Sequence, residues 1–154
     1  MNASHSHNQS SLLQGLASLA GRIMIATIFL LSAVGNKIPN FEGVVGYMTK
    51  HEVPSPRLLL IGAIALLIVG SLSVILGLFT RVGAGLLLVF LLAATYHFPN
   101  FWALEGAAQQ AETIQFMKNL SLMGAMVFLM ANGPGALSLD GWLNRRKQAT
   151  SPSL

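Results

Sequence analysis

The sequence predicts an all-α fold, an integral membrane four-helix bundle with a short amphipathic interfacial helix between helices 1 and 2. Three long stretches without a charged residue carry this prediction: 23 residues between Arg57 and Arg81, 23 between Arg81 and Glu105, and 21 between Lys118 and Asp140. About 20 apolar residues in a helix cross the ~30 Å hydrocarbon layer of a bilayer. Only 9% of the 154 residues are charged, against about 25% in soluble domains.

A soluble four-helix bundle is the alternative, and it needs a polar face along every helix. Residues 58–80 offer only Ser71, Ser73 and Thr80 as polar side chains. A helix that is apolar all round is either buried or lies in lipid, and four such helices in so short a chain cannot bury one another. The membrane bundle is therefore the preferred interpretation.

The chain is expected to divide into one transmembrane domain, residues 12–147, between two disordered tails, residues 1–11 and 148–154. The first spanning helix is expected to run from Leu12 or Leu16 to Gly35. A cleaved signal peptide is its alternative, because residues 33–35 loosely fit a cleavage site. No basic residue precedes Arg22, so an uncleaved helix is the better explanation.

The segment after Pro39 predicts the interfacial helix. Its apolar residues Phe41, Val44, Val45 and Met48 follow the spacing i, i+3, i+4 and i+7, which places them on one helical face. With Asn40 as a possible N-cap, this pattern is typical of a helix lying in the membrane interface. A helix packed within a loop is a compatible alternative.

Proline and capping residues delimit the remaining helices. Ser55 followed by Pro56 predicts the start of the second spanning helix, which should end near Gly77. Thr80 is expected to cap the third helix, and Pro99 to stop it. Small residues on both helices, Gly70 and Gly83 among them, permit close helix contacts.

The fourth helix is expected from about Ile114 to Asn132, after a polar connection over residues 100–115. Ser138 can then cap a short terminal helix. With four spans, both termini lie on one side, which holds five basic residues against four on the other. The positive-inside rule thus favours cytoplasmic termini.

Two groups of polar residues border the spans. Arg22, Arg81 and Asp140 are predicted to meet at the inner face as an ionic cluster, although such charges can simply pin helices and anchor headgroups. At the outer face, Lys37 and His97 end two helices and Lys118 opens another, which predicts a pocket rim. An anionic or quinone-like headgroup suits such cations beside aromatic rings. Interfacial anchoring is the simpler explanation.

The composition excludes several kinds of chemistry. The chain has no cysteine, so it supplies no disulfide, thiol redox centre, cysteine-bound zinc or iron–sulfur cluster. His5 and His7 make a poor metal site without a carboxylate. We find no phosphate-binding loop and no nucleophile elbow, and no basic stripe for nucleic acid. The sequence thus predicts no catalytic residue, no metal and no nucleic-acid partner.

Several motifs follow one another along the chain: the run RIMIATIFLLSAVGNK over residues 22–37, GLFTR over 77–81, FMKNL over 116–120, GPG over 133–135 and SLD over 138–140. In this order and spacing they resemble the DoxX family of small bacterial inner-membrane proteins. The resemblance covers about residues 16–147. It implies a four-helix, multi-pass bundle in the inner membrane, with Arg22, Lys37, Arg81, Lys118 and Asp140 as the family-typical polar positions.

Some members of this family are subunits of membrane oxidoreductases or associate with them, including thiosulfate–quinone systems. The resemblance implies a non-catalytic subunit or scaffold of a quinone-linked system, with oxidoreductase subunits or a second copy of the chain as partners. It implies no resident cofactor beyond a quinone contact. Many relatives carry an acid midway along the second helix, where this chain has Leu67; a proton or ion relay there lacks its carboxylate.

A second function is compatible with the same residues. The protein can be a small-molecule binder or transporter that uses the outer rim of Lys37, His97 and Lys118. An enzyme acting alone ranks last, because it would need redox chemistry without cysteine or a resident metal.

Overall fold

The computed structural model describes residues 3–97 and 104–150, and these residues form helices and no strand. The helices are α1 (Ala3–Leu31), the π-helix η1 (Ser32–Lys37), α2 (Phe41–Lys50), α3 (Pro56–Leu76), α4 (Thr80–His97), α5 (Gly106–Asn132) and α6 (Leu139–Thr150). Four segments are long and apolar enough to cross a membrane: Leu12–Lys37, Pro56–Leu76, Thr80–His97 and Gly106–Asn132. The predicted all-α membrane bundle is confirmed.

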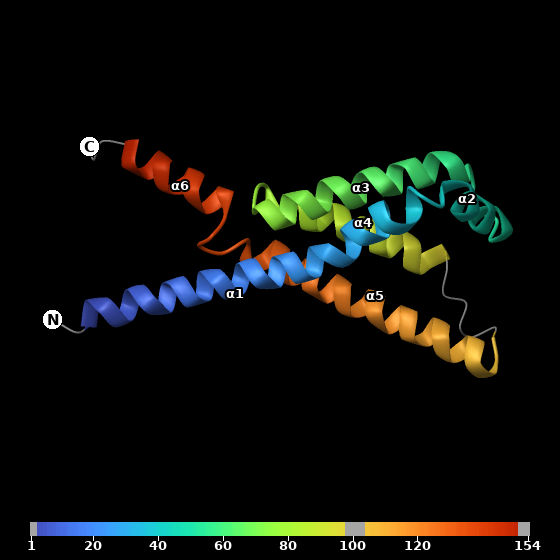
Figure 1. The fold of residues 1–154 in the computed structure, drawn as a ribbon, viewed down its shortest axis with the longest axis horizontal. Helices are drawn as coiled ribbons and strands as arrows, with labels where there is room; N and C mark the ends of the chain where they lie inside the picture. The colour runs from blue at the N-terminus through green and yellow to red at the C-terminus, as the bar shows by residue number, and fades with distance from the viewer. Residues whose placement is uncertain (1–2, 98–103, 151–154) are drawn as a thin grey trace.

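The long helices run along the long axis of the molecule (Figure 1). Both termini and the α3–α4 turn lie at one end, which we call the termini end. The opposite end, formed by η1, α2 and the start of α5, is the loop end. Helix α3 makes its most extensive contact with α4, α4 also packs on α5, and α1 packs on α3.

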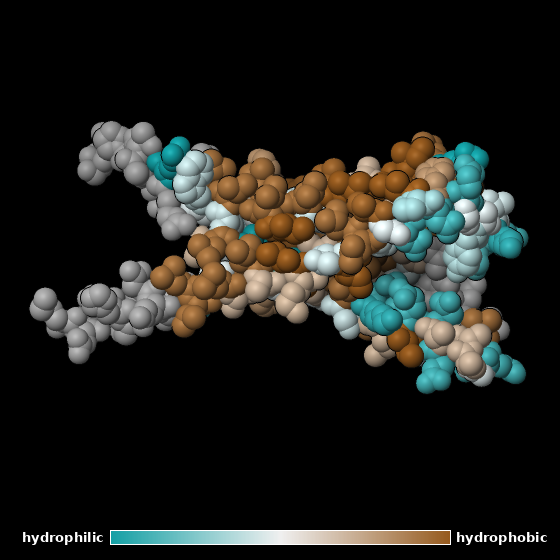
Figure 2. Space-filling model, viewed as in Figure 1, coloured by the Kyte–Doolittle hydropathy of each residue, from teal (hydrophilic) through white to brown (hydrophobic). Residues whose placement is uncertain are grey.

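The core contains buried side chains from every spanning helix, such as Ala26, Leu67, Leu87 and Met126. Leu67 is therefore a packing residue at the centre of the bundle. Hydrophobic side chains cover the middle of the molecule, and polar ones gather at the loop end (Figure 2). Such an apolar belt places the middle of the bundle in contact with the lipid bilayer.

Glycine allows α3 and α4 to approach closely. A Cβ atom on Gly70 would lie 3.0 Å from the carbonyl oxygen of Gly83, and one on Gly83 would lie 3.1 Å from the carbonyl oxygen of Gly70. Both distances are too short for a normal contact, so larger residues would push the two backbones apart. This contact is the one that the small residues of the two helices predict.

Some helix ends differ from the sequence-based expectation. Helix α1 begins at Ala3, within the tail expected over residues 1–11, and α6 reaches into residues 148–150. No proline or glycine interrupts residues 3–14, so the helix propagates back from the apolar segment. Helix α5 begins eight residues before Ile114, because residues 107–111 are mostly good helix formers. The expected end of the third helix near Pro99 lies outside the described residues.

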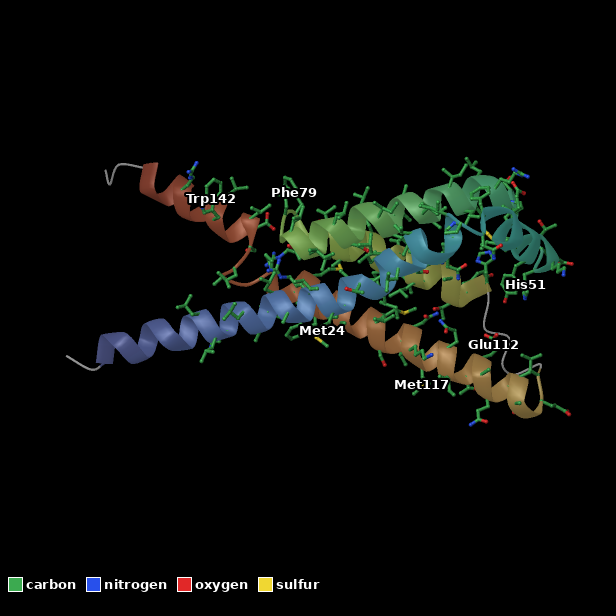
Figure 3. All side chains as sticks on the ribbon, viewed as in Figure 1. Met24, His51, Phe79, Glu112, Met117 and Trp142 are labelled. Carbon is green, nitrogen blue, oxygen red and sulfur yellow. The ribbon has the colours of Figure 1, made fainter. Side chains whose placement is uncertain are left out.

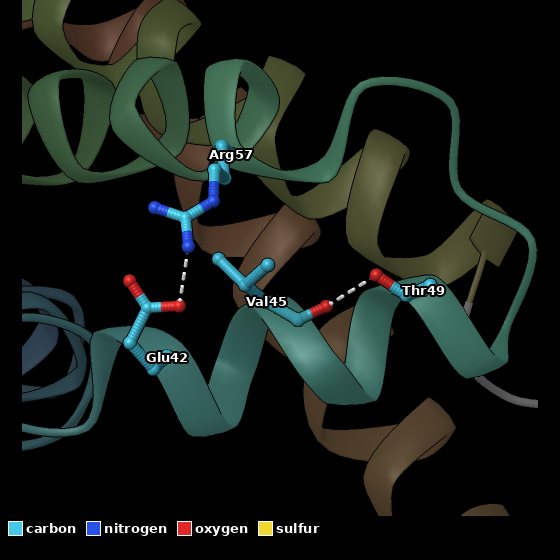
Figure 4. Close-up of polar contacts among 4 residues, drawn as sticks. All are labelled: Glu42, Val45, Thr49 and Arg57. Atoms are coloured by element: carbon cyan, nitrogen blue, oxygen red, sulfur yellow. Dashed lines mark hydrogen bonds and ion pairs between the residues drawn. The ribbon is translucent and has the colours of Figure 1, made fainter.

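Helix α2 lies across the start of α3. Its buried Val45 and Met48 pack with Val53 and Leu60, as expected for its apolar face. On the polar side, Arg57 donates to a carboxylate oxygen of Glu42 at 2.7 Å (Figure 4). The helix thus covers the loop end of the bundle.

Candidate functional site

The α3–α4 turn at the termini end collects polar contacts from distant parts of the chain. Gly77 ends α3 in a left-handed conformation, with φ of 67°. Its N–H donates to Val74 O at 3.3 Å, and the N–H of Leu78 donates to Ser73 O at 3.1 Å. These two bonds form a Schellman motif. The left-handed conformation explains why glycine stands in the GLFTR motif.

Arg22 reaches this turn from α1. Its side chain is only 1% exposed, and its guanidinium donates to Val74 O at 3.3 Å, to Ile75 O at 3.4 Å and also to Leu137 O. Two of these acceptors belong to the last turn of α3, where the helix dipole is negative. The buried charge is therefore compensated by backbone carbonyls.

Asp140 binds the other side of the same turn. Its carboxylate accepts the N–H of Phe79 at 3.0 Å, the N–H of Thr80 at 3.2 Å and the Thr80 hydroxyl at 3.5 Å. The Asp140 N–H in turn donates to Gly77 O at 2.9 Å. The carboxylate thus caps the positive N-terminus of α4, although Thr80 was the residue expected to cap this helix.

Arg81 completes the arrangement by donating to Ala131 O at 3.4 Å, in the last turn of α5. The structure therefore places Arg22, Arg81 and Asp140 at one end of the bundle, where each binds backbone groups and the described side chains show no ion pair among the three. Each of them binds a helix end whose dipole has the opposite sign. These bonds connect α1, α3, α4, α5 and α6. The three charged side chains therefore serve to hold the helices together.

At the loop end, a cavity of about 750 Å³ lies between η1, α2, α3 and α4. Most of its wall is apolar. Its polar lining residues are Asn36, Lys37, Asn40, Tyr47 and His97. The cavity is therefore an apolar space with its polar groups on η1, on α2, in the segment between them and at the end of α4.

The π-helix η1 positions Lys37 in this cavity. In η1 the N–H of Ile38 donates to Ala33 O at 2.9 Å, five residues back. The Lys37 ammonium donates to the Ser32 hydroxyl at 2.7 Å and lies 5.5 Å from the centroid of the Phe90 ring. Short π-helical turns are frequent at functional sites, and nothing in the apolar sequence of this segment signals one.

The predicted rim residues lie in two places. Lys37 and His97 line the same cavity, where His97 Nδ1 lies 3.0 Å from Ala93 O. Lys118 instead lines a separate groove of about 460 Å³ between α1 and α5, together with Ile28 and Met117. Met117 marks this side of α5 in Figure 3. The cavity thus combines two of the three predicted residues.

Tyr47 is a cavity residue that the sequence does not single out. Its ring packs on His51 with the centroids 4.2 Å apart. Partial burial raises the pKa of the Tyr47 phenol, and the nearby charge of Glu112 raises it further. His51, directly after α2, and Glu112 on α5 are labelled at the loop end (Figure 3). The i, i+4 spacing of Tyr47 and His51 is the sequence pattern from which this ring contact could have been predicted.

Comparison with known proteins supports the resemblance found in the sequence. Residues 17–100 match the family model described as DoxX, which is more than half of the chain. The chain belongs to the DoxX family. The matched segment contains Arg22, Lys37 and His97, whereas Lys118 and Asp140 lie beyond it.

Two relatives from Escherichia coli strain K12 are similar to this DoxX-family chain over most of its length. Inner membrane protein YphA is 34% identical over 122 residues, which cover 79% of this chain and 86% of the relative. Inner membrane protein YqjF is 33% identical over 134 residues, which cover 87% and 97%. No solved structure matches this chain. These relatives and the four apolar helices confirm an integral membrane protein.

Proposed function

We propose that the protein is a non-catalytic binder of a small lipid-soluble molecule, which it holds in the loop-end cavity. The observation that carries this proposal is the cavity itself. Its volume of about 750 Å³ falls in the ~300–1,000 Å³ range of small-molecule sites, which combine apolar walls with a few polar groups. The apolar belt of the bundle lies in the bilayer, so a molecule dissolved in the bilayer could reach this cavity.

The side chains around the cavity suit recognition of a polar headgroup. Lys37, Tyr47 and His97 are the titratable residues among the described lining residues. The described lining residues include no carboxylate, and Leu67 is packed in the core. This set supports binding in preference to a proton-coupled pump, which needs an ionisable relay through the membrane.

A quinone is one lipid-soluble molecule that such a cavity suits, since its ring bears polar oxygens and its tail is apolar. The protein would then serve as a non-catalytic subunit or scaffold beside a membrane oxidoreductase, as its family resemblance implies. At the termini end, Arg22, Arg81 and Asp140 bind helix ends and hold the helices together, which favours a scaffold role. Purification in mild detergent should then recover an oxidoreductase subunit, and a deletion strain without any redox phenotype would count against this role.

We also propose that the termini are cytoplasmic, so that the cavity faces the outer side. The natural chain has no cysteine, which permits single-cysteine labelling in cells. A cysteine at exposed Glu52 should react with a membrane-impermeant maleimide from outside, and one at Leu154 should not. The reverse pattern would place the cavity on the cytoplasmic side.

Filling the cavity tests the binding function. Gly62 lines the cavity and Gly124 lies on α5 away from it, and a Cβ atom on either glycine meets no other atom within 4 Å. Gly62→Leu should therefore occupy ligand space, and Gly124→Leu is its matched control. Mass spectrometry of protein purified in mild detergent should find a lipid-soluble molecule with wild type and Gly124→Leu. Equal retention by Gly62→Leu would refute the proposed site.

A further inference from the structure

We propose that the ligand of the loop-end cavity is an anionic amphiphile, whose charged oxygen headgroup binds Lys37 and whose apolar tail lies between α3 and α4. This inference rests on the proposed function and adds the charge, the orientation and the entry route of the ligand. Four observations support it, namely the partners of Lys37, the depth of the cavity, its exposed apolar lining and the position of α2.

The ammonium of Lys37 lies in an apolar cavity beside neutral partners. These are the Ser32 hydroxyl and the face of Phe90. Throughout the described side chains, the one ion pair is that of Arg57 with Glu42, so no carboxylate neutralises Lys37. A cation against apolar surface is costly unless an anion accompanies it. An anionic headgroup would supply the missing charge and a charge-assisted hydrogen bond.

The remaining lining residues define where the tail would lie. The cavity follows α3 from Leu58 to Leu66 and α4 from His97 back to Val89. Eight residues of helix correspond to about 12 Å, which is a little less than half of the ~30 Å hydrocarbon layer. Lys37 ends the first spanning segment, so the headgroup would sit near the interface and the tail would extend toward the bilayer centre.

The surroundings of the cavity favour entry from the lipid. Leu59 and Val89 line it and keep 45% and 56% of their surface exposed, and Val89 lies midway along the spanning helix α4. Helix α2 covers the water-facing side, because its apolar face is buried and its Glu42 is bonded to Arg57 (Figure 4). An amphiphile dissolved in the bilayer would therefore reach the cavity sideways, between helices.

Three probes with the same alkyl chain test this proposal on the purified full-length protein in nanodiscs. They are palmitate, hexadecyl phosphate and the neutral methyl palmitate, each competing with a spin-labelled fatty acid. We expect at least one anionic probe to bind about tenfold more tightly than the ester, since a hydrogen bond to a charged acceptor is stronger than one to a neutral ester oxygen. A preference between the two anions identifies the headgroup as carboxylate or phosphate.

Substitutions assign the preference to Lys37. Lys37→Met keeps the length of the side chain and should abolish the preference of the site for the anions over the ester. Lys37→Arg should retain the preference, and Lys118→Met is the matched control in the other groove. If the ester binds as well as the anions and Lys37→Met changes nothing, the charge proposal fails and the binding function stands. If no probe binds and Gly62→Leu has no effect on retained molecules, both fail.

Discussion

Removing the carboxylate of Asp140 should destabilise the bundle, because this group caps α4 from a different helix. In Asp140→Ala the N–H groups of Phe79 and Thr80 lose their acceptor. In Asp140→Asn one side-chain oxygen can still accept, but the negative charge at the helix N-terminus is lost. Asp140→Asn thus keeps an acceptor for one of the two N–H groups, whereas Asp140→Ala keeps none, and both variants lose the charge.

The magnitudes follow from these contacts. Loss of an N-cap costs about 0.5–2 kcal/mol, and loss of a favourable charge at a helix end costs about 0.3–1 kcal/mol. We therefore expect the free energy of unfolding to fall by about 2 kcal/mol in Asp140→Ala. In Asp140→Asn the decrease should be smaller, about 1–1.5 kcal/mol, because one N–H keeps its acceptor while the other N–H bond and the charge at the helix end are lost.

The assay is equilibrium unfolding of the full chain in mixed micelles, followed by circular dichroism. Glu42→Ala is the control, because it breaks an ion pair whose side chains are 66% and 69% exposed. Exposed pairs contribute only about 0–1 kcal/mol. If Asp140→Ala lowers stability no more than Glu42→Ala does, the capping argument is refuted.

Three further predictions concern other parts of the bundle. Gly77→Ala should lower stability by roughly 2 kcal/mol, because the left-handed conformation costs an L-residue about 1–2 kcal/mol and the new Cβ would meet the guanidinium of Arg22. Tyr47 should ionise above the usual phenol pKa in an alkaline absorbance titration, and Glu112→Gln should lower this pKa only in part, because burial is the larger cause. The stability that the neutral phenol contributes is present below pH ~10 and is lost as the pH rises through the raised pKa. Asn119→Leu should weaken the contact of α5 with α4 by about 1 kcal/mol, since Asn119 is buried and donates to Thr95 Oγ1 at 3.0 Å.

Each of these has a matched control. Gly124→Ala lies in open space and should leave stability almost unchanged; an equal loss in both glycine variants would contradict the argument for Gly77. The titration uses a Tyr96→Phe background, and a midpoint for Tyr47 that is not above the ordinary value would contradict the effect of burial. For Asn119, the double variant with Thr95→Val should lose little more than either single one, and full additivity would exclude a direct interaction.

The sequence predicts those parts of the fold that depend on local pattern. The uncharged stretches identify the four spans, and Ser138 caps α6 as expected by accepting the N–H of Gly141 at 3.0 Å. At Asn40 and Ser55, the helices of the described chain begin as predicted but without a side-chain cap bond. The start positions are thus predictable, whereas the hydrogen bonds depend on backbone angles such as the φ of 47° at Ser55.

The site residues were harder to predict because their partners are distant in the sequence. The sequence predicts one ionic cluster for the charges at the termini end, whereas the helix ends that they bind depend on how the α3–α4 hairpin meets α1 and α6. At the other end, Lys37 and His97 share a cavity and Lys118 does not, since Lys118 lies on α5, beyond α4. The π-helical turn that directs Lys37 inward has no signature in a run of apolar residues.

The double attachment of the α3–α4 turn has a consequence for biogenesis. Arg22 lies in the first of the four spanning segments, whereas Asp140 lies in α6, which is translated after the fourth. A nascent chain that stops before Leu139 has all four spanning segments, yet the N-terminus of α4 still lacks its carboxylate. The tertiary structure of this turn is therefore completed only when α6 has been translated, and a chain truncated before Asp140 would offer an unfinished turn to quality-control proteases.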